Sequence, residues 1–282
     1  MMYLLIEIAI ILWFILFVVF FKEKRKMLIY SLLFSTIFEL LGLLSKGYTY
    51  NQNFSFSIFN LPIFVILSWS IILVTSYTLV SKITTHRLTK AFICALSVIS
   101  VDLIFEAPSV ALGLWKWNTY SSTLFANINP YNFIGWLFVS FLFIYFYEKK
   151  PIYSLIIALP VYVLTQLINL GLLMIPIIHN LNPYFILLII YLGFVISSIV
   201  LYVRHKIKER KKLNLKEVIE IWVFRLPFFL FGIIACIMNN LSYSFVILIM
   251  FIGLFQEMII YILIIDNSKI KEEKTKIKNR KN

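Results

Sequence analysis

The sequence has few charged residues and only two cysteines. Of its 282 residues only 14% are charged, whereas 61% are hydrophobic and 17% are aromatic. A soluble domain is about one quarter charged, so a single soluble globule is excluded. The two cysteines, Cys94 and Cys236, both lie inside apolar runs, and no disulfide framework is expected. The length of the apolar runs indicates a polytopic α-helical membrane protein.

Histidine and glycine are also scarce, which limits metal and nucleotide chemistry. His86 and His205 fall in segments that the charge pattern assigns to the inner side, and His179 falls in an outer one. We therefore expect no two of them to share a metal with a cysteine, and neither a zinc nor a haem site is expected. The eight glycines never occur as Gly-x-Gly, which excludes the dinucleotide and P-loop fingerprints. Nucleic acid is not expected as a partner either, because the Lys and Arg residues border apolar spans instead of forming a basic patch of the size of a nucleic-acid groove.

Nine apolar segments are long enough to cross about 30 Å of hydrocarbon. They cover residues 2–21, 27–44, 59–81, 91–114, 131–147, 152–178, 184–203, 218–238 and 244–265. The predicted fold class is all-α, a polytopic integral membrane helix bundle of about nine transmembrane helices in one domain, residues 1–268. Pro160 and Pro176 predict a kink or a broken end in the sixth segment. Residues 269–282 form a basic tail that we expect to be disordered.

The basic residues orient this bundle, because Lys and Arg collect on the cytoplasmic side of a membrane. Residues 22–26, 82–90, 148–150, 204–217 and 269–282 hold 23 of the 26 bases. Lys46 and Lys116 fall in segments on the opposite side, and Arg225 lies within a span. The N-terminus is therefore predicted outside and the C-terminus in the cytoplasm, with the protein in the cell membrane. Anionic lipid is a candidate partner of the inner basic segments.

Three acidic residues fall inside the spans at similar depths. Glu39 in the second span and Asp102 and Glu106 in the fourth lie roughly 16 to 22 Å from the inner ends, at 1.5 Å per residue. Asp102 and Glu106 are four residues apart and nearly stacked on one helix face. Two such carboxyls cannot both ionise cheaply in a low dielectric, so we expect one to keep its proton. This arrangement suits general acid–base catalysis, or else the acids only join neighbouring helices by hydrogen bonds.

The remaining buried polar residues have simpler interpretations. Arg225 and Glu257 lie on consecutive spans that form a hairpin, and we predict that they make a structural ion pair. Glu7 lies near the outer surface, where its side chain is expected to reach the interface, and it has no predicted chemistry. Gln166 and Asn169, at a depth comparable to the acids, either orient a water or join helices.

The spacing of Asp102 and Glu106 also has the Asp-x-x-x-Glu form of motifs that hold Mg²⁺-diphosphate in membrane prenyltransferases. Those enzymes use two acidic clusters, whereas the only other aspartate here, Asp266, lies at the predicted inner surface. We therefore expect no metal site at this pair.

Several motifs follow one another in the order seen in a known family. They are Glu39-Leu-Leu-Gly42, Gly47-Tyr48-Thr49-Tyr50, Pro62, Trp69, Asp102-x-x-x-Glu106, Trp115-Lys116-Trp117 and Pro130-Tyr131-Asn132-Phe133-Ile134-Gly135-Trp136. With these motifs the chain resembles the carotenoid-biosynthesis membrane family that includes the bisanhydrobacterioruberin hydratase and the γ-carotene 1′,2′-hydratase. The resemblance covers residues 35–145 in detail. Family members often carry Pro directly after the second acid, whereas Ala107 precedes Pro108 here.

The resemblance implies a hydro-lyase that adds water to a terminal isoprenoid double bond and yields a tertiary alcohol. Asp102, Glu106 and Glu39 are then the catalytic acids, although the sequence does not assign the proton donor among them. The implied substrate-binding residues are Tyr48, Tyr50, Trp115, Trp117, Asn132 and Trp136. They would form a lid over the reacting end, where aromatic faces stabilise a cation; an interfacial belt is the alternative for each. The implied partners are an apolar polyene from the bilayer and water, and no cofactor is implied.

A second class of protein also places acids inside the membrane. A proton-coupled transporter or a lipid flippase uses such acids as proton relays, although such proteins often contain inverted repeats and none is visible here. A hydratase that acts on a lipid or polyprenol rather than a carotenoid is a further alternative.

Overall fold

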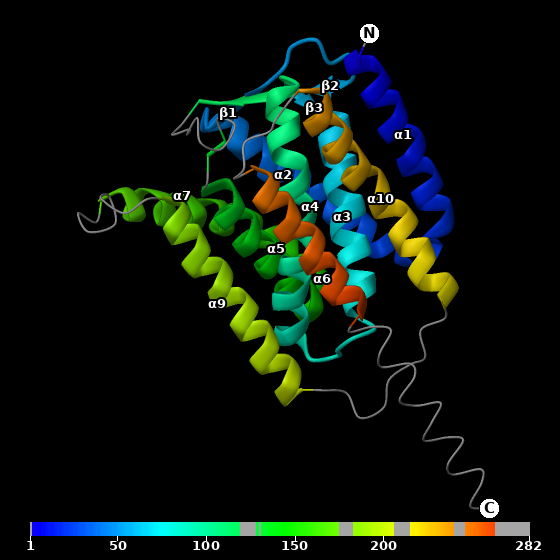
Figure 1. Cartoon of the computed structure of the whole chain (residues 1–282), viewed down its shortest axis with the longest axis vertical. Coiled ribbons are helices and arrows are strands. Elements are labelled where there is room, and N and C mark those ends of the chain that lie inside the picture. Colours follow the sequence, from blue (N-terminus) through cyan, green and yellow to red (C-terminus); the bar gives the residue numbers. More distant parts are fainter. Residues whose placement is uncertain are drawn as a thin grey trace, which may run out of the picture.

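Long apolar helices run side by side through the structure, a computed structural model that describes residues 2–118, 128–129, 131–174, 183–205, 215–239 and 246–262 (Figure 1). The long helices are α1 (Met2–Phe20), α2 (Arg25–Leu44), α3 (Ile63–Val80), α4 (Arg87–Ala111), α5 (Tyr131–Lys149), α9 (Pro183–Arg204) and α10 (Leu215–Met238). Shorter helices are η1 (Lys22–Lys24), α6 (Pro151–Ile156), α7 (Ala158–Met174) and a last helix, Val246–Ile262. The predicted tail, residues 269–282, and His179 lie outside the described residues.

Within the described residues, seven helices are long and apolar enough to cross a membrane. Two shorter apolar helices, Pro151–Leu167 and Val246–Ile262, lie where the sixth and ninth spans are predicted. The polytopic membrane helix bundle is therefore confirmed, whereas the count of nine spans stays a prediction. The sixth predicted span is broken at Ile157, between α6 and α7, so that Pro160 lies in the first turn of α7, where proline is tolerated.

Helix α4 is the central helix and packs against α3, α5, α9 and α10. Two glycines let neighbouring helices approach its backbone. A β-carbon at Gly232 of α10 would lie 2.5 Å from the Ile104 carbonyl oxygen, and one at Gly253 of the last helix would lie 2.7 Å from the Ser100 carbonyl oxygen. Small residues at helix crossings are the usual means of close packing within a bilayer. This packing fixes the helix that carries Asp102 and Glu106.

Two small sheets, which the sequence did not predict, accompany the helices. Strand β1 (Tyr48–Tyr50) pairs antiparallel with β4 (Trp115–Trp117), with Tyr48 opposite Trp117 and Tyr50 opposite Trp115. Strands β2 (Ser57–Ile58) and β3 (Leu61–Pro62) form a second pair. Side chains alternate along a strand, so the four aromatic rings of the β1–β4 pair share one face and Thr49 and Lys116 occupy the other. We call the end of the bundle that carries these strands the strand end.

Glu7 corrects one prediction, since its carboxylate is fully buried and does not reach the interface. Its two oxygens accept hydrogen bonds from the backbone N–H groups of Ser55 (2.9 Å) and Phe56 (2.8 Å). The loop that leads into β2 covers α1 and supplies these donors. Glu7 therefore ties the first helix to the strand end.

The opposite end of the bundle carries the bases that follow α1 and precede α4, and we call it the basic end. Here the rings of His86 and His205 stack with centroids 3.6 Å apart, a contact that the sequence did not predict. The Thr89 hydroxyl lies 3.0 Å and 3.4 Å from their Nδ1 atoms. Desolvation, together with the nearby charges of His205, Arg87 and Arg204, lowers the pKa of His86. This pair joins the start of α4 to the end of α9.

Candidate active site

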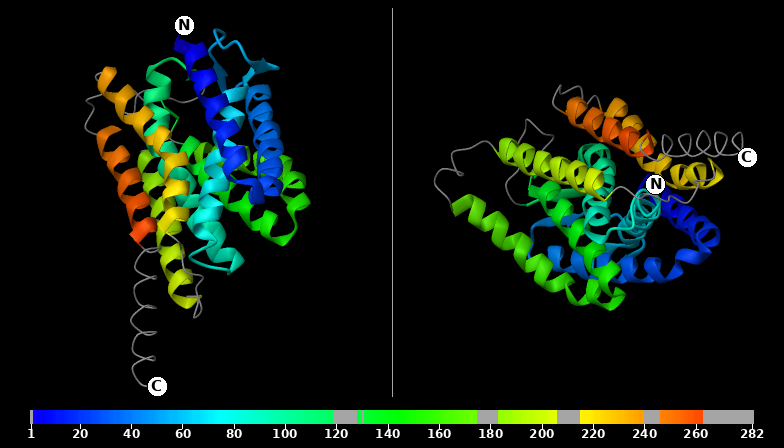
Figure 2. Two further views of the ribbon diagram at one scale, coloured as in Figure 1. Left: turned by 90° about the vertical axis from the view of Figure 1, so that its right-hand side faces the viewer. Right: turned by 90° about the horizontal axis from the view of Figure 1, so that it is seen from below.

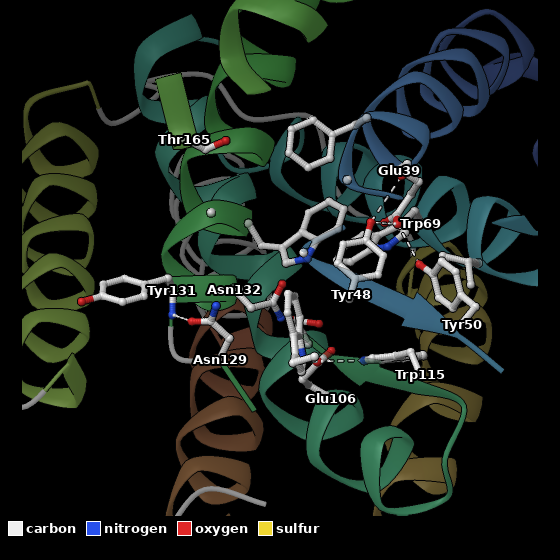
Figure 3. A pocket seen from close by; sticks show the side chains of 18 of the residues that line it. Glu39, Tyr48, Tyr50, Trp69, Glu106, Trp115, Asn129, Tyr131, Asn132 and Thr165 are labelled. Carbon is white, nitrogen blue, oxygen red and sulfur yellow. Dashed lines mark hydrogen bonds between the residues drawn. The ribbon is translucent and has the colours of Figure 1, made fainter. Parts of the chain in front are cut away.

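A cavity of about 270 Å³ lies among α2, α3, α4, α5 and α7, beneath the β1–β4 pair (Figure 3). The structure brings every predicted catalytic and substrate-binding residue to its wall. These residues are Glu39, Asp102, Glu106, Tyr48, Tyr50, Trp115, Trp117, Asn132 and Trp136. The three acids are buried, although they come from two helices far apart in the sequence.

Glu39 of α2 is held by the two tyrosines of β1. The hydroxyl groups of Tyr48 and Tyr50 donate to its Oε2 atom at 2.5 Å and 2.7 Å. Burial and the neighbouring Glu39 carboxyl hold the pKa of both tyrosines well above the usual value, so both remain donors. Gly42 makes this contact possible, because a β-carbon there would lie 2.9 Å from Cζ of the Tyr48 ring. Figure 3 shows Trp69 beside the same carboxyl.

Glu106 of α4 is held in the same way by the two tryptophans of β4. The indole Nε1 groups of Trp115 and Trp117 donate to its Oε1 atom at 3.0 Å and 2.8 Å. An indole N–H can only donate, so this oxygen must act as an acceptor. The β1–β4 pair thus directs four donors toward two carboxyls, one pair of donors from each strand.

Asp102 has a different environment from the two glutamates. Among the described residues, its carboxyl accepts one hydrogen bond, from the Asn132 amide nitrogen at 3.3 Å. The ion pairs between described residues join Lys90 to Glu148 and Arg225 to Glu257, so none of them reaches the cavity acids. Within the described ranges, the buried Asp102 carboxyl therefore has neither a cation nor a pair of donors to stabilise a negative charge.

Aromatic rings form the wall beside these acids. The indoles of Trp69 and Trp136 stack with centroids 3.3 Å apart, and Phe38 packs against Trp136 at 5.7 Å. The motif order drew attention to Trp69, but the contribution of Phe38 was missed because an apolar helix offers many equivalent phenylalanines.

Helix α7 supplies a further part of the wall that the sequence analysis largely missed. Tyr162, Thr165 and Gln166 line the cavity. Only Gln166 had a sequence signal, which was its depth. The side chain of Asn169, predicted together with it, lies outside the described part of the structure.

Arg225 and Glu257 lie away from this cavity and form a bidentate pair. Nε and Nη2 of the guanidinium donate to the two carboxylate oxygens at 2.6 Å and 2.9 Å. The remaining donors reach Ser76 Oγ at 2.8 Å and the Ser97 carbonyl oxygen at 2.6 Å. All of these groups are buried and paired, so the cluster links α3, α4, α10 and the last helix.

No group of three His, Cys, Asp or Glu side chains in the described ranges is arranged to hold a metal ion. The stacked His86 and His205 have no acidic or cysteine side chain that completes such a group among these residues.

Comparison with known proteins identifies a family for the chain. A family model described as carotenoid biosynthesis protein matches residues 1–194, a range that contains every residue of the cavity wall. No curated protein and no solved structure gives a significant match. The family match covers more than half of the chain, and seven apolar helices accompany it. The chain therefore belongs to the carotenoid biosynthesis protein family, as a membrane protein with a role in carotenoid metabolism.

Proposed function

We propose that the protein is a hydratase that adds water to the terminal double bond of an apolar isoprenoid chain. The observation that carries the proposal is the contrast among the three cavity acids. Glu39 and Glu106 each accept two hydrogen bonds at one oxygen, whereas Asp102 accepts a single long one. Hydrogen bonds to a carboxylate favour its charged form, and their absence in a buried site favours the neutral acid. One cavity therefore offers a proton donor beside two proton acceptors.

Asp102 is the proton donor in this mechanism. Its carboxyl proton adds to the less substituted carbon of the terminal C=C bond, and the π electrons form the new C–H bond. The positive charge is left on the tertiary carbon. A water molecule attacks that carbon and forms the C–O bond, and Glu106 or Glu39 accepts the proton that the water loses. Glu106 lies one helical turn from Asp102, so this proton can return to Asp102, and the net change is the addition of one water.

The cavity wall also suits the cationic intermediate. Aromatic faces stabilise a desolvated cation by about 0.5–2 kcal/mol each. The stacked indoles of Trp69 and Trp136 lie beside the acids. A carboxylate at Glu39 or Glu106 would add negative charge near the cation, and no ion pair between described residues involves either acid. These residues therefore bind and shield the reacting end, while the hydrogen-bonded tyrosines and tryptophans orient the acids.

Membership of the carotenoid biosynthesis family favours an enzyme over a proton-coupled transporter or a lipid flippase. We further propose a carotenoid or related polyene as substrate, the cell membrane as the location, and anionic lipid as a partner at the basic end, where Lys22, Lys82 and Arg87 lie. The proposed reaction uses no cofactor, because hydration is redox-neutral and needs neither an oxidant nor a reductant.

The decisive test is the substitution Asp102→Asn. Loss of a general acid typically lowers the rate by about 10²–10⁴-fold, and we expect the tertiary alcohol to fall by at least about 10²-fold. The matched control is Glu23→Gln, which removes an exposed acid at the basic end. The measurement is mass spectrometry of pigments from a carotenoid-producing host grown in H₂¹⁸O. Unlabelled product in the wild type would refute hydration, and full turnover by Asp102→Asn would refute the assignment of the donor.

A further inference from the structure

We infer that the cavity opens sideways to the bilayer between α5 and α7, through a portal framed by Gly135 and Gln166 that admits the long isoprenoid chain. The identity of the chain rests on the proposed function, whereas the portal rests on the geometry. Neither residue is among the predicted catalytic or substrate-binding residues.

The cavity is too small to hold a whole carotenoid. Pockets that enclose drug-sized ligands measure about 300–1,000 Å³, and this cavity is about 270 Å³. It therefore has room for the reacting end of a carotenoid but not for the whole polyene. The rest of the chain must leave the cavity through an opening that an apolar group can pass.

Two sides of the cavity are closed. The β1–β4 pair covers the strand end, and its four aromatic side chains are hydrogen-bonded to Glu39 and Glu106. On the side of α3 and α4, the buried side chains of Val65, Ile72 and Val101 form the wall. A chain that crossed either side would have to break the hydrogen bonds of the acids or enter the packed core.

The space beside Gly135 is open. This residue lines the cavity one helical turn after Asn132 on α5, and it is half-buried. A β-carbon built at Gly135 would meet no atom within 4 Å. At Gly42, by contrast, a β-carbon would overlap the Tyr48 ring. Gly135 therefore leaves the helix surface open at the point where the cavity passes between α5 and α7.

The facing side of the portal belongs to α7. Gln166 lines the cavity, is half-buried, and has no hydrogen bond to another described residue. Val163, Leu164 and Leu167 of the same helix are exposed and form a lipid-facing surface. Figure 3 shows Thr165 of α7 across the cavity from Tyr50. An isoprenoid chain can thus reach the acids from the lipid without crossing the strand end.

The test fills the portal from either side, with the variants Gly135→Leu and Gln166→Trp. The matched control is Gly193→Leu on α9, because a β-carbon at Gly193 also meets no atom within 4 Å and Gly193 does not line the cavity. Each variant is produced in a carotenoid-accumulating host, and the polyene that co-purifies with the protein is measured by absorbance per mole of protein. Thermal unfolding in detergent confirms that each variant is folded.

We expect Gly135→Leu and Gln166→Trp to retain at least about tenfold less polyene than the wild type, a change of about 1.4 kcal/mol in binding, while Gly193→Leu retains the wild-type amount. Wild-type retention by both portal variants would overturn the portal, and so would a wild type that retains no polyene. If the wild type binds polyene, the portal variants lose this binding, and no alcohol forms, then the hydratase activity is refuted and the portal is not. Binding and turnover thus separate the two proposals.

Discussion

Tyr50 and Trp115 face each other across β1 and β4, yet they donate to different acids. Each strand places its two aromatic residues two positions apart, so both rings point to the same face. The helices bring Glu39 and Glu106 beneath that face. A carboxylate that accepts two donors at one oxygen is fixed in orientation, and in the proposed reaction its other oxygen would act on water. At the scale of single residues, the donors therefore serve the acids rather than the substrate directly.

The variant Trp117→Phe tests this role, because it keeps an aromatic ring and removes one N–H donor from Glu106. A hydrogen bond to a charged group contributes about 1.5–3 kcal/mol, so we expect kcat/KM to fall about 10- to 100-fold. The control is Trp222→Phe, which makes the same change at an exposed tryptophan of α10. The measurement is alcohol formation by membranes supplied with polyene. An equal loss in both variants would show that the effect is not specific to Glu106.

The acids of the site could be predicted from the sequence, but their partners could not. Glu39, Asp102 and Glu106 are recognisable because a carboxyl inside an apolar span is energetically costly unless it is paired or has a function. Their hydrogen-bond partners depend on the register between β1 and β4, two segments more than 60 residues apart in the chain. The hydrogen-bond partners of Glu7 could not be predicted from the sequence either. Its burial depends on backbone donors of a loop that no side-chain pattern reveals.

At the scale of elements, the helices followed from the sequence and the strands did not. A span of about 20 apolar residues is a strong signal, and the observed helix ends lie within a few residues of the predicted ones. The strands β1 and β4 contain three residues each, which is too short for an alternating pattern to identify them. The tight packing of α4 was equally invisible, because it depends on which glycine faces which carbonyl group.

A pair of identical substitutions tests that packing. In a helix interior, Gly→Ala gains about 1 kcal/mol from backbone propensity, and Gly193→Ala on α9 should show this gain because its surroundings are open. Gly232→Ala places a methyl group against the Ile104 carbonyl oxygen, and overpacking costs about 1–3 kcal/mol. We expect the midpoint of thermal unfolding in detergent to rise for Gly193→Ala and to fall for Gly232→Ala. A rise in both would mean that α10 does not approach α4 closely.

At the scale of the whole molecule, the two ends of the bundle have different chemistry. The strands, the aromatic donors and the cavity acids lie toward one end, as Figure 2 also shows for the strands near the N-terminus. The bases that follow α1 and α5 lie at the other, where Lys90 pairs with Glu148. This asymmetry is what the charge pattern predicts for a bundle with its basic end in the cytoplasm. The reaction cavity would then lie closer to the outer surface.

Cysteine labelling in intact cells tests this orientation. Asn53→Cys places a thiol in the exposed loop at the strand end, and Thr85→Cys places one in the exposed turn before α4 at the basic end. A membrane-impermeant maleimide should label Asn53→Cys in intact cells and should label Thr85→Cys only after the cells are opened. The wild type provides the background, because Cys94 is buried and Cys236 lies within an apolar helix. Labelling of Thr85→Cys alone in intact cells would reverse the orientation. The acids would then lie nearer the cytoplasmic leaflet, and the polyene would have to enter the portal from that side.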